Sequence, residues 1–151
     1  WNIQNQREMV VFNSKKSSLI AERNGENVSL YANDSLLEIA SKNKTLSGYL
    51  MGNFSRLTTK KNLKNLFYFN GNKILILDSL GVYPKGIRPD IVVFTQSPKI
   101  NLERFLTATK PKIVVADASN YRNIQKLWKA TCLKAKIPFH ATGEKGFYRL
   151  E

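Results

Sequence analysis

The sequence has one cysteine, one histidine and few acidic residues, and each scarcity excludes a class of site. A single cysteine, Cys132, excludes a disulfide within the chain and a zinc site built from several cysteines. A single histidine, His140, leaves no His-x-His-x-Asp-His or His-Glu-x-x-His spacing, so a zinc hydrolase site is not expected. Gly-x-Gly-x-x-Gly and P-loop patterns are also missing, which removes two common routes to nucleotide binding. We expect Cys132 to be a buried, inert thiol and His140 to be an exposed or half-buried strand residue.

Long apolar runs are missing as well. No stretch approaches the roughly 18 consecutive apolar residues of a membrane helix, and no signal-peptide pattern opens the chain. An apolar content of 42% over 151 residues suffices for the core of one domain. The sequence therefore predicts a single soluble domain over residues 1–151, and its start at Trp1 leads us to expect that it is excised from a larger protein.

The charge, in contrast, is strongly positive. Lysine and arginine number 24 against 11 aspartate and glutamate residues, which gives a formal net charge of +13. This excess favours polyanionic partners, either nucleic acid, whose phosphates attract Lys and Arg whatever the base sequence, or an anionic membrane surface. A surface that serves solubility alone is the alternative.

The centre of the chain has the pattern of a strand, a helix and a second strand. Ile91–Phe94 and Ile113–Ala116 are short apolar runs rich in β-branched residues, as in strands that are covered on both faces. Between them, apolar residues at Leu102 and three and four positions later predict a helix, with Asn101 as its cap and Lys110-Pro111 as its stop. The unit predicts an α/β fold with α+β-like layering. Ligands usually meet such sheets at the carboxyl ends of strands, here from Thr95 to Lys99.

The first half predicts an antiparallel meander followed by a less regular region. The meander has three strands, Glu8–Phe12, Ser18–Ala21 and Asn27–Tyr31, with an Asn-Gly turn before the third. Ser35–Ala40 has the apolar stripe of a short helix. From Ser41 to Asn65 basic residues are interleaved with Tyr49 and Phe54. This region is either a solvated connection or a strip that follows a nucleic-acid backbone and stacks bases.

The second half predicts two hairpins and a further helix. Asn70-Gly71 permits the positive φ angles of a type I′ turn, so a hairpin is expected. An amphipathic helix is expected from Tyr121 to about Ala135, with caps from Asp117–Asn120. The first hairpin has the strands Leu66–Phe69 and Lys73–Leu77. The apolar face of the helix is expected at Ile124, Leu127, Trp128, Thr131 and Ala135. The last hairpin is expected to pair Ile137–Ala141 with Phe147–Leu150.

Three aspartates next to strand ends, Asp78, Asp90 and Asp117, are the candidates for an all-carboxylate magnesium site. Asp90 precedes its strand, whereas the other two follow theirs, so the three do not share one edge of a parallel sheet. Asp78 stands shortly before Gly81 and is a metal ligand or a turn former; without partners we favour the turn.

Three segments carry a resemblance to a known family. Pro89–Ser97 is similar to its Ala-Asp-Val-Leu-Lys-Val-x-His-His-Gly-Ser motif, Phe105–Val115 to its helix, Lys-Pro turn and next strand, and Thr142–Gly146 to its final Thr-Asp-x-Asp-Gly turn. The family is the C-terminal domain of ComEC-like competence proteins, which are multi-pass membrane channels for importing transforming DNA, and the chain looks most like their Bacteroidetes branch. The resemblance implies a truncated metallo-β-lactamase-like fold, with sheet layers and flanking helices, and a parent protein in the bacterial inner membrane.

The departures from the family's pattern decide the expected chemistry. Thr95-Gln96 stand where the family has its histidine pair, and Asp78 lies near the position of its metal-bridging aspartate. One carboxylate does not hold a catalytic zinc pair. The resemblance therefore implies a degenerate member without metal or cofactor, with Asp78, Thr95 and Gln96 as vestigial metal-site positions and no catalytic residues.

Three hypotheses remain. The first is a non-catalytic accessory domain that binds or guides DNA through a basic surface, with DNA and the membrane-embedded part of the parent channel as partners. The candidate phosphate contacts are Lys15, Lys16, Lys60, Lys61, Lys99, Lys110, Lys112 and Arg122. The second is a structural or protein-interaction domain without direct DNA contact. The third is a surviving nuclease that uses Asp78 and Asp117 with magnesium.

Overall fold

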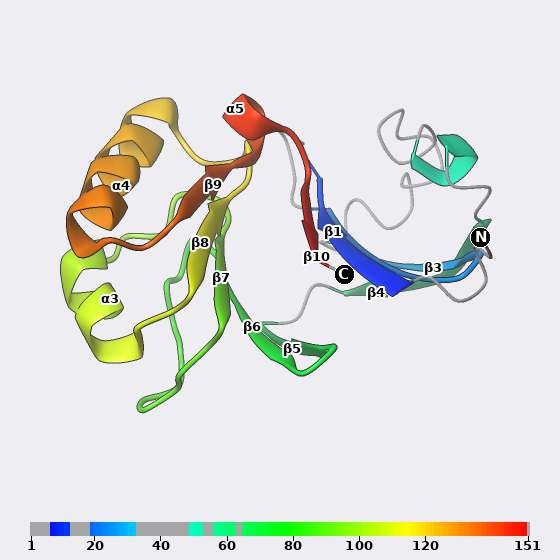
Figure 1. The fold of residues 1–151 in the computed structure, drawn as a ribbon, viewed down its shortest axis with the longest axis horizontal. Coiled ribbons are helices and arrows are strands. Elements are labelled where there is room, and N and C mark those ends of the chain that lie inside the picture. Colours follow the sequence, from blue (N-terminus) through cyan, green and yellow to red (C-terminus); the bar gives the residue numbers. More distant parts are fainter. Residues whose placement is uncertain (1–6, 13–18, 33–48, 53–55, 63–64, 151) are drawn as a thin grey trace.

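The computed structural model describes residues 7–12, 19–32, 49–52, 56–62 and 65–150, and of residues 56–62 it describes the backbone only. Two five-stranded sheets, with two helices on one of them, form the layered α/β fold that the sequence predicts (Figure 1). The predicted helix at Ser35–Ala40 lies outside the described residues. No helix in the described ranges has the length and apolarity that a membrane crossing requires.

The first sheet has the strand order β10-β1-β2-β3-β4. Its strands are β1 (Arg7–Val11), β2 (Ile20–Asn24), β3 (Asn27–Ala32), β4 (Arg56–Asn62) and β10 (Tyr148–Leu150). The predicted antiparallel meander of β1, β2 and β3 is confirmed, and Gly25, at a φ of 65°, makes the turn before β3. β4 runs parallel to β3. The expectation of a connection there was wrong, because backbone pairing with β3 makes a strand of this polar segment.

The second sheet has the order β5-β6-β7-β8-β9. Its strands are β5 (Leu66–Phe69), β6 (Asn72–Leu77), β7 (Ile91–Phe94), β8 (Ile113–Ala116) and β9 (Phe139–Ala141). The predicted hairpin of β5 and β6 is confirmed, with φ angles of 49° and 80° at Asn70 and Gly71. β6, β7, β8 and β9 are parallel, so their carboxyl ends lie at one edge.

The predicted central helix is confirmed as α3 (Leu102–Thr109). Asn101 caps it, since its Oδ1 accepts a hydrogen bond from the N–H of Arg104 at 3.1 Å. Lys110 ends it in the left-handed conformation, at a φ of 46°, and donates its N–H to the carbonyl of Leu106. The buried face of α3 is Leu102, Phe105, Leu106 and Thr109.

The second predicted helix is α4 (Arg122–Ala135). Tyr121 occupies its N-cap position and makes no side-chain cap bond, so the caps expected from Asp117–Asn120 were wrong. Trp128 and Cys132 are its buried residues, whereas Leu127 is 65% exposed, contrary to its predicted place on the apolar face. Cys132 is buried as expected, and burial raises the pKa of its thiol to about 11.

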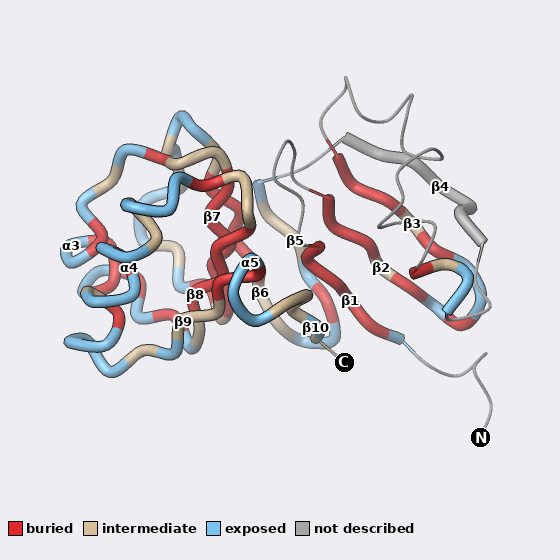
Figure 2. The backbone as a smooth tube through the Cα atoms, turned by 90° about the horizontal axis from the view of Figure 1, so that it is seen from above, coloured by how far each residue is buried: buried red, intermediate tan, exposed pale blue. Residues whose placement is uncertain are grey.

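Alternate residues of the second sheet feed two different cores, because successive side chains of a strand point to opposite faces. In β7, Val92 and Phe94 pack under α3 and α4, whereas Ile91 and Val93 pack against the first sheet. Phe94, Phe105 and Trp128 form the aromatic centre of the helical layer, with Phe94 and Trp128 centroids 4.7 Å apart. Figure 2 shows the buried strands between the exposed helices and the first sheet.

The pairing of the last two strands differs from the prediction. The last two strands were expected to form a hairpin, but β9 pairs with β8 in the second sheet and β10 pairs antiparallel with β1 in the first. Between them, α5 (Thr142–Lys145) and Gly146, at a φ of 84°, redirect the chain. The carboxyl-terminal segment therefore connects the two sheets.

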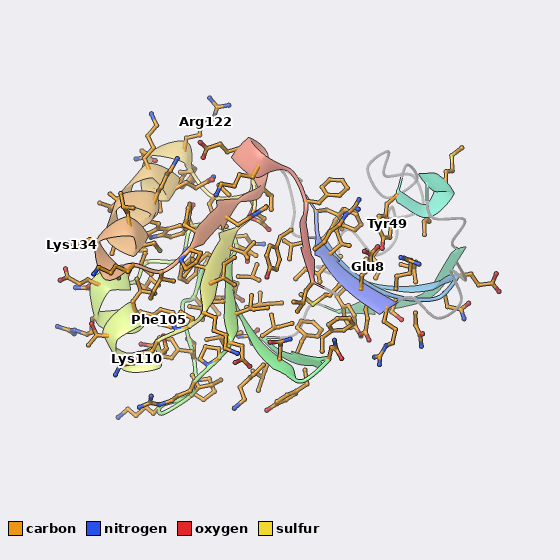
Figure 3. All side chains as sticks on the ribbon, in the orientation of Figure 1. Glu8, Tyr49, Phe105, Lys110, Arg122 and Lys134 are labelled. Carbon is orange, nitrogen blue, oxygen red and sulfur yellow. The ribbon has the colours of Figure 1, made fainter. Side chains whose placement is uncertain are left out.

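A buried ion pair lies within the first sheet. Glu8 and Arg23 are direct cross-strand neighbours that are 4% and 3% exposed, and Arg23 Nε donates to Glu8 Oε1 at 3.2 Å. The Tyr49 hydroxyl donates to the same oxygen at 2.5 Å, and Figure 3 shows Tyr49 beside Glu8. Burial, then the Glu8 carboxylate, raise the pKa of Tyr49 well above its ordinary value.

Candidate functional site

The carboxyl edge of the second sheet is where four parallel strands end side by side, and ligands commonly bind at such edges. We use the name carboxyl edge for the four residues that follow these strands and the loops that they begin. Those residues are Asp78, Thr95, Asp117 and Thr142. Asp78 and Thr95, two of the three positions that the sequence resemblance relates to a metal site, thus lie at one edge, and Gln96 follows Thr95.

Asp78 is a turn former in this structure. Its Oδ1 accepts the N–H of Leu80 at 3.0 Å, and its carbonyl accepts the N–H of Gly81 at 3.0 Å. Gly81 has a φ of 64°, and a Cβ there would lie 3.1 Å from the side chain of Ile100. The sharp turn therefore requires glycine, and the turn interpretation of Asp78 is confirmed.

Thr95 and Gln96, which the sequence resemblance relates to a histidine pair, are held by hydrogen bonds and an unusual backbone conformation. Thr95 is fully buried, and its N–H and Oγ1 both donate to the carbonyl of Leu77, at 2.8 and 3.3 Å. Gln96 and Ser97 have φ values of 58° and 52°, a conformation that non-glycine residues rarely adopt and that the surrounding structure must enforce.

The loop that follows β8 holds Gln96 and Ser97 in this backbone conformation. The N–H of Gln96 donates to Ser119 Oγ at 2.9 Å, and the N–H of Ser97 donates to Asn120 Oδ1 at 2.8 Å. In return, Ser97 Oγ accepts the N–H of Tyr121 at 2.8 Å. We call the side chains of Ser97, Ser119 and Asn120 the loop latch, because they join the loops after β7 and β8.

Asn120 is the centre of the loop latch. It is 4% exposed, and its Nδ2 donates to the carbonyls of Phe94 and Asp117 at 2.7 and 2.9 Å. The Asp117 carboxylate, 1% exposed, accepts from the N–H of Ser119 at 3.0 Å and from the Ser119 hydroxyl. These polar groups are engaged with one another, so the carboxyl edge is held closed by hydrogen bonds.

The aspartates do not form a magnesium site in this arrangement. Asp78 and Asp117 follow strands that are separated by β7, so two strand spacings of about 4.8 Å put their backbones roughly 10 Å apart. Asp90 lies at the opposite edge, as expected from its place before β7. Within the described ranges, no group of three or more His, Cys, Asp or Glu side chains could hold a metal ion.

Asp90 has a structural role at that opposite edge. Its Oδ2 accepts the N–H of Lys73 at 2.8 Å, and its Oδ1 lies 3.4 Å from Lys112 Nζ. The hydrogen bond from Lys73 is the main cause, and the Lys112 charge a further cause, of a lowered pKa of Asp90. The pairing engages one of the predicted phosphate contacts, Lys112, with a carboxylate of the same chain.

Two other groups at the carboxyl edge complete its description. Thr142 is fully buried, and its Oγ1 has no hydrogen-bond partner among the described residues. His140 is half-buried, as expected, and its Nε2 lies 2.9 Å from the carbonyl of Gly146. A base for a nucleophilic triad would have to be this residue, and its ring is engaged with the turn and packed edge-on against Tyr148.

The predicted phosphate contacts are spread over the molecule. Lys15 and Lys16 lie outside the described residues, and Lys60 and Lys61 lie in β4, whose side chains are not described. Lys99 and Arg122 are exposed and lie just before α3 and at the start of α4, which both begin near the carboxyl edge. Lys110 and Lys112 are exposed at the other end of α3, and Figure 3 shows Lys110 apart from Arg122.

α4 has a basic face, of which only Arg122 is among the predicted phosphate contacts. Arg122, Lys126 and Lys129 are exposed and follow each other at intervals of four and three residues, so they line one face of the helix. Lys129 Nζ lies 3.2 Å from Glu144 Oε1. The first turn of α4 contains no acidic residue. The interval of the cations in the sequence already predicts this face, either as a phosphate contact or as the solvated side of an amphipathic helix.

A furrow runs between α3 and α4 on the outer surface. Its larger hollow has a volume of about 740 Å³ and is bounded by Leu106, Ile137, Lys110 and Lys134 among other residues. A second hollow of about 450 Å³ lies nearer the carboxyl edge, where Lys99 faces the region of Leu127 and Trp128. Lysines therefore stand at both ends of the furrow.

Comparison with known protein families gives one match. The family model of the ComEC C-terminal domain matches residues 9–151, which is almost the whole chain. Searches of curated proteins and of solved structures returned no match. The family links the chain to competence DNA uptake and to a membrane channel component. The chain belongs to the ComEC C-terminal domain family.

Proposed function

We propose that this chain is a non-catalytic accessory domain of a competence channel and that it binds or guides DNA through a basic surface. We define the basic surface by Arg122, Lys126 and Lys129 of α4. The proposal includes that residues 1–151 form one domain of a larger bacterial inner-membrane protein, with a degenerate, truncated metallo-β-lactamase-like fold. No cofactor is part of it.

The charge distribution supports the location of this surface. Residues 95–147, which contain the helical layer, have ten Lys and Arg but three Asp and Glu residues. Of the three acidic residues, Asp117 is buried in the loop latch and Glu144 is paired with Lys129, which leaves Glu103. The positive charge of this layer is therefore compensated by few carboxylates.

The single observation that carries the proposal is the row of Arg122, Lys126 and Lys129 along α4. Successive members are about 5–6 Å apart in space. Arg122 and Lys126 can therefore contact phosphates along one strand, and Lys129 can join them by exchanging its exposed ion pair with Glu144 for a phosphate. Figure 3 shows Arg122 at the end of α4 that lies nearer to α5. Lys99 lies at a different face of α4, because it lines a hollow with Leu127 and Trp128, which do not share a helix face with Arg122, Lys126 and Lys129.

The proposal that the domain is not catalytic is supported by the hydrogen bonds that the side chains at the carboxyl edge make. The groups that stand at the family's metal positions form turns and inter-loop hydrogen bonds: Asp78 bonds to Leu80, and Thr95 bonds to Leu77. A divalent ion would have to compete with these bonds and would find Asp78 and Asp117 far apart.

A charge-neutralising variant tests the proposal. In Arg122→Gln/Lys126→Gln/Lys129→Gln, glutamine keeps a helix propensity close to that of the original residues, so α4 should fold. We expect the slope of log K against log salt for DNA to become less steep by roughly 2 to 3, since each phosphate contact contributes about 0.7 to 0.9. Fluorescence anisotropy with labelled DNA from low to high salt measures this slope.

The matched control removes the same charge elsewhere. Lys85, Arg88 and Arg149 are exposed and lie outside α4, in the loop after β6 and in β10. The triple variant Lys85→Gln/Arg88→Gln/Arg149→Gln should retain most of the wild-type slope. Equal losses in the two triple variants would show that binding follows net charge alone, and the basic surface would then have no special role.

The second candidate is a structural or protein-interaction domain of the channel without direct DNA contact. The exposed apolar side chains favour it: Leu80 and Leu133 are both 78% exposed, and Val82 is 67% exposed. Contiguous exposed apolar surface is typical of protein contacts, and Leu80 and Val82 are close together in the loop after β6. Retention of this chain by the membrane part of the parent protein, together with no DNA binding at low salt, would select this candidate.

A further inference from the structure

The tyrosines of this chain fall into two groups. Four of the six are paired with another aromatic ring: Tyr31 with Phe67, Tyr49 with Phe12, Tyr83 with Phe105 and Tyr148 with His140. The other two, Tyr68 and Tyr121, are each 69% exposed. Lys73 Nζ lies 6.0 Å from the ring centroid of Tyr68, whereas Tyr121 makes no ring contact with any described residue.

Tyr121 is exposed but firmly anchored. Its N–H donates to Ser97 Oγ at 2.8 Å, and its carbonyl accepts the N–H of Gln125 at 3.0 Å. The loop latch and the first turn of α4 thus fix its backbone, which leaves only the two side-chain torsions to be ordered by a partner. A tyrosine in this state offers a large flat surface at a low cost in conformational entropy.

Two cations follow Tyr121 in the first turns of α4. Arg122 follows it directly, and Lys126 lies one turn further along α4. An aromatic ring that is exposed beside a row of phosphate-binding side chains is the arrangement by which proteins hold nucleic-acid strands whose bases are unpaired. The cations contact the backbone and the ring stacks on a base.

We propose that Tyr121 is a base-stacking residue and that the basic surface therefore takes unpaired nucleotides in preference to a closed duplex. The inference rests on the proposed function, since it assumes that the basic surface contacts nucleic acid. To the proposed function it adds a stacking residue and a preference for single-stranded nucleic acid. Net charge alone does not explain such a preference, because phosphates are present in single and double strands alike.

The test uses the 151-residue chain and three labelled probes of equal length: a single-stranded oligonucleotide, its duplex, and a single strand without bases. In Tyr121→Leu the backbone contacts of Tyr121 are kept and the ring is lost. We expect single-strand affinity to fall roughly five-fold or more at fixed salt, with an unchanged salt slope. Binding of the strand without bases should be unaltered, and Tyr121→Trp should retain wild-type affinity.

Tyr68→Leu is the matched control, because Tyr68 has the same exposure as Tyr121 but lies on β5. It should bind all three probes as the wild type does. Ultraviolet cross-linking of the wild-type complex, read by mass spectrometry, gives a second measurement that needs no variant, and we expect the cross-linked peptide to contain Tyr121.

The outcomes separate this inference from the proposed function. Wild-type affinity in Tyr121→Leu, or an equal loss on the strand without bases, overturns the stacking role and leaves the basic surface intact. A cross-link at Tyr68 in place of Tyr121 also overturns it. Failure of the wild-type chain to bind any probe at low salt overturns the proposed function and the inference together.

Discussion

The two sheets each contain a buried polar network, and the networks differ in charge and in surroundings. In the first sheet, Glu8, Arg23 and Tyr49 form a charged network within a strand pair. In the second, Asn120 and Ser119 join two loops around one carboxylate, Asp117. The exposed rim of the second network carries Arg122 and Lys99, whereas the first is enclosed by apolar side chains. The comparison teaches that the buried polar groups of both networks bond to one another, so that in the second network the exposed cations are the groups left to meet a partner in the proposed function.

The largest expected effect comes from breaking the charged network. Arg23→Met leaves the Glu8 carboxylate buried without its cross-strand cation, and we expect the free energy of unfolding to fall by roughly 3–5 kcal/mol. Denaturant unfolding followed by circular dichroism measures it. The control is Arg7→Met in the same sheet, because the Arg7–Glu22 pair is exposed and spans 3.7 Å. That variant should change stability by about 1 kcal/mol or less, and equal effects would contradict the comparison.

The second network should give a smaller but clear effect. Asn120→Ala removes the acceptor of the Ser97 N–H and the donor to two carbonyls, so we expect a loss of roughly 3 kcal/mol, the upper range for one orphaned buried group. Asn123→Ala, three residues further on and exposed, should lie within about 0.5 kcal/mol of the wild type. If Asn120→Ala were as stable as Asn123→Ala, the loop latch would not hold the carboxyl edge.

The smallest effect concerns Asp90 and pH. The pKa of Asp90 is lowered in the folded state, so its ionised form stabilises the fold above the ordinary carboxyl pKa of about 4, and this contribution is lost as the pH falls through the folded-state pKa. We expect Asp90→Asn to be less stable than the wild type at neutral pH. The difference should narrow as the pH falls below about 4. Thermal unfolding from pH 7 to pH 3 checks this, and a difference that grows on acidification would contradict it.

Elements set by local signals were predictable from the sequence. The strands β7 and β8 follow from their apolar runs, the β5–β6 hairpin from Asn70-Gly71, and α3 from its spacing and the Asn101 cap. Each depends on residues close in the chain. The position of Asp90 opposite the other aspartates also followed from strand direction alone.

Elements that depend on residues far away in the sequence could not be predicted from it. β4 is polar and becomes a strand by pairing with β3, and β10 pairs with β1 at the other end of the chain. Ser119 and Asn120 had the pattern of helix caps, but they bind the loop after β7, which lies 23 residues away. The positive φ angles of Gln96 and Ser97 carry no glycine signal and depend on that contact.

The central claim is that the basic surface of α4 binds DNA and that the domain does not cleave it. The most direct measurement is binding of single- and double-stranded DNA by this chain across a salt series, with magnesium and zinc present so that cleavage shows in the same samples. We predict binding that weakens steeply with salt, and intact DNA. Absence of binding at low salt, or cleavage that Asp78→Asn abolishes, would contradict the account, the first in favour of an interaction domain and the second in favour of a nuclease.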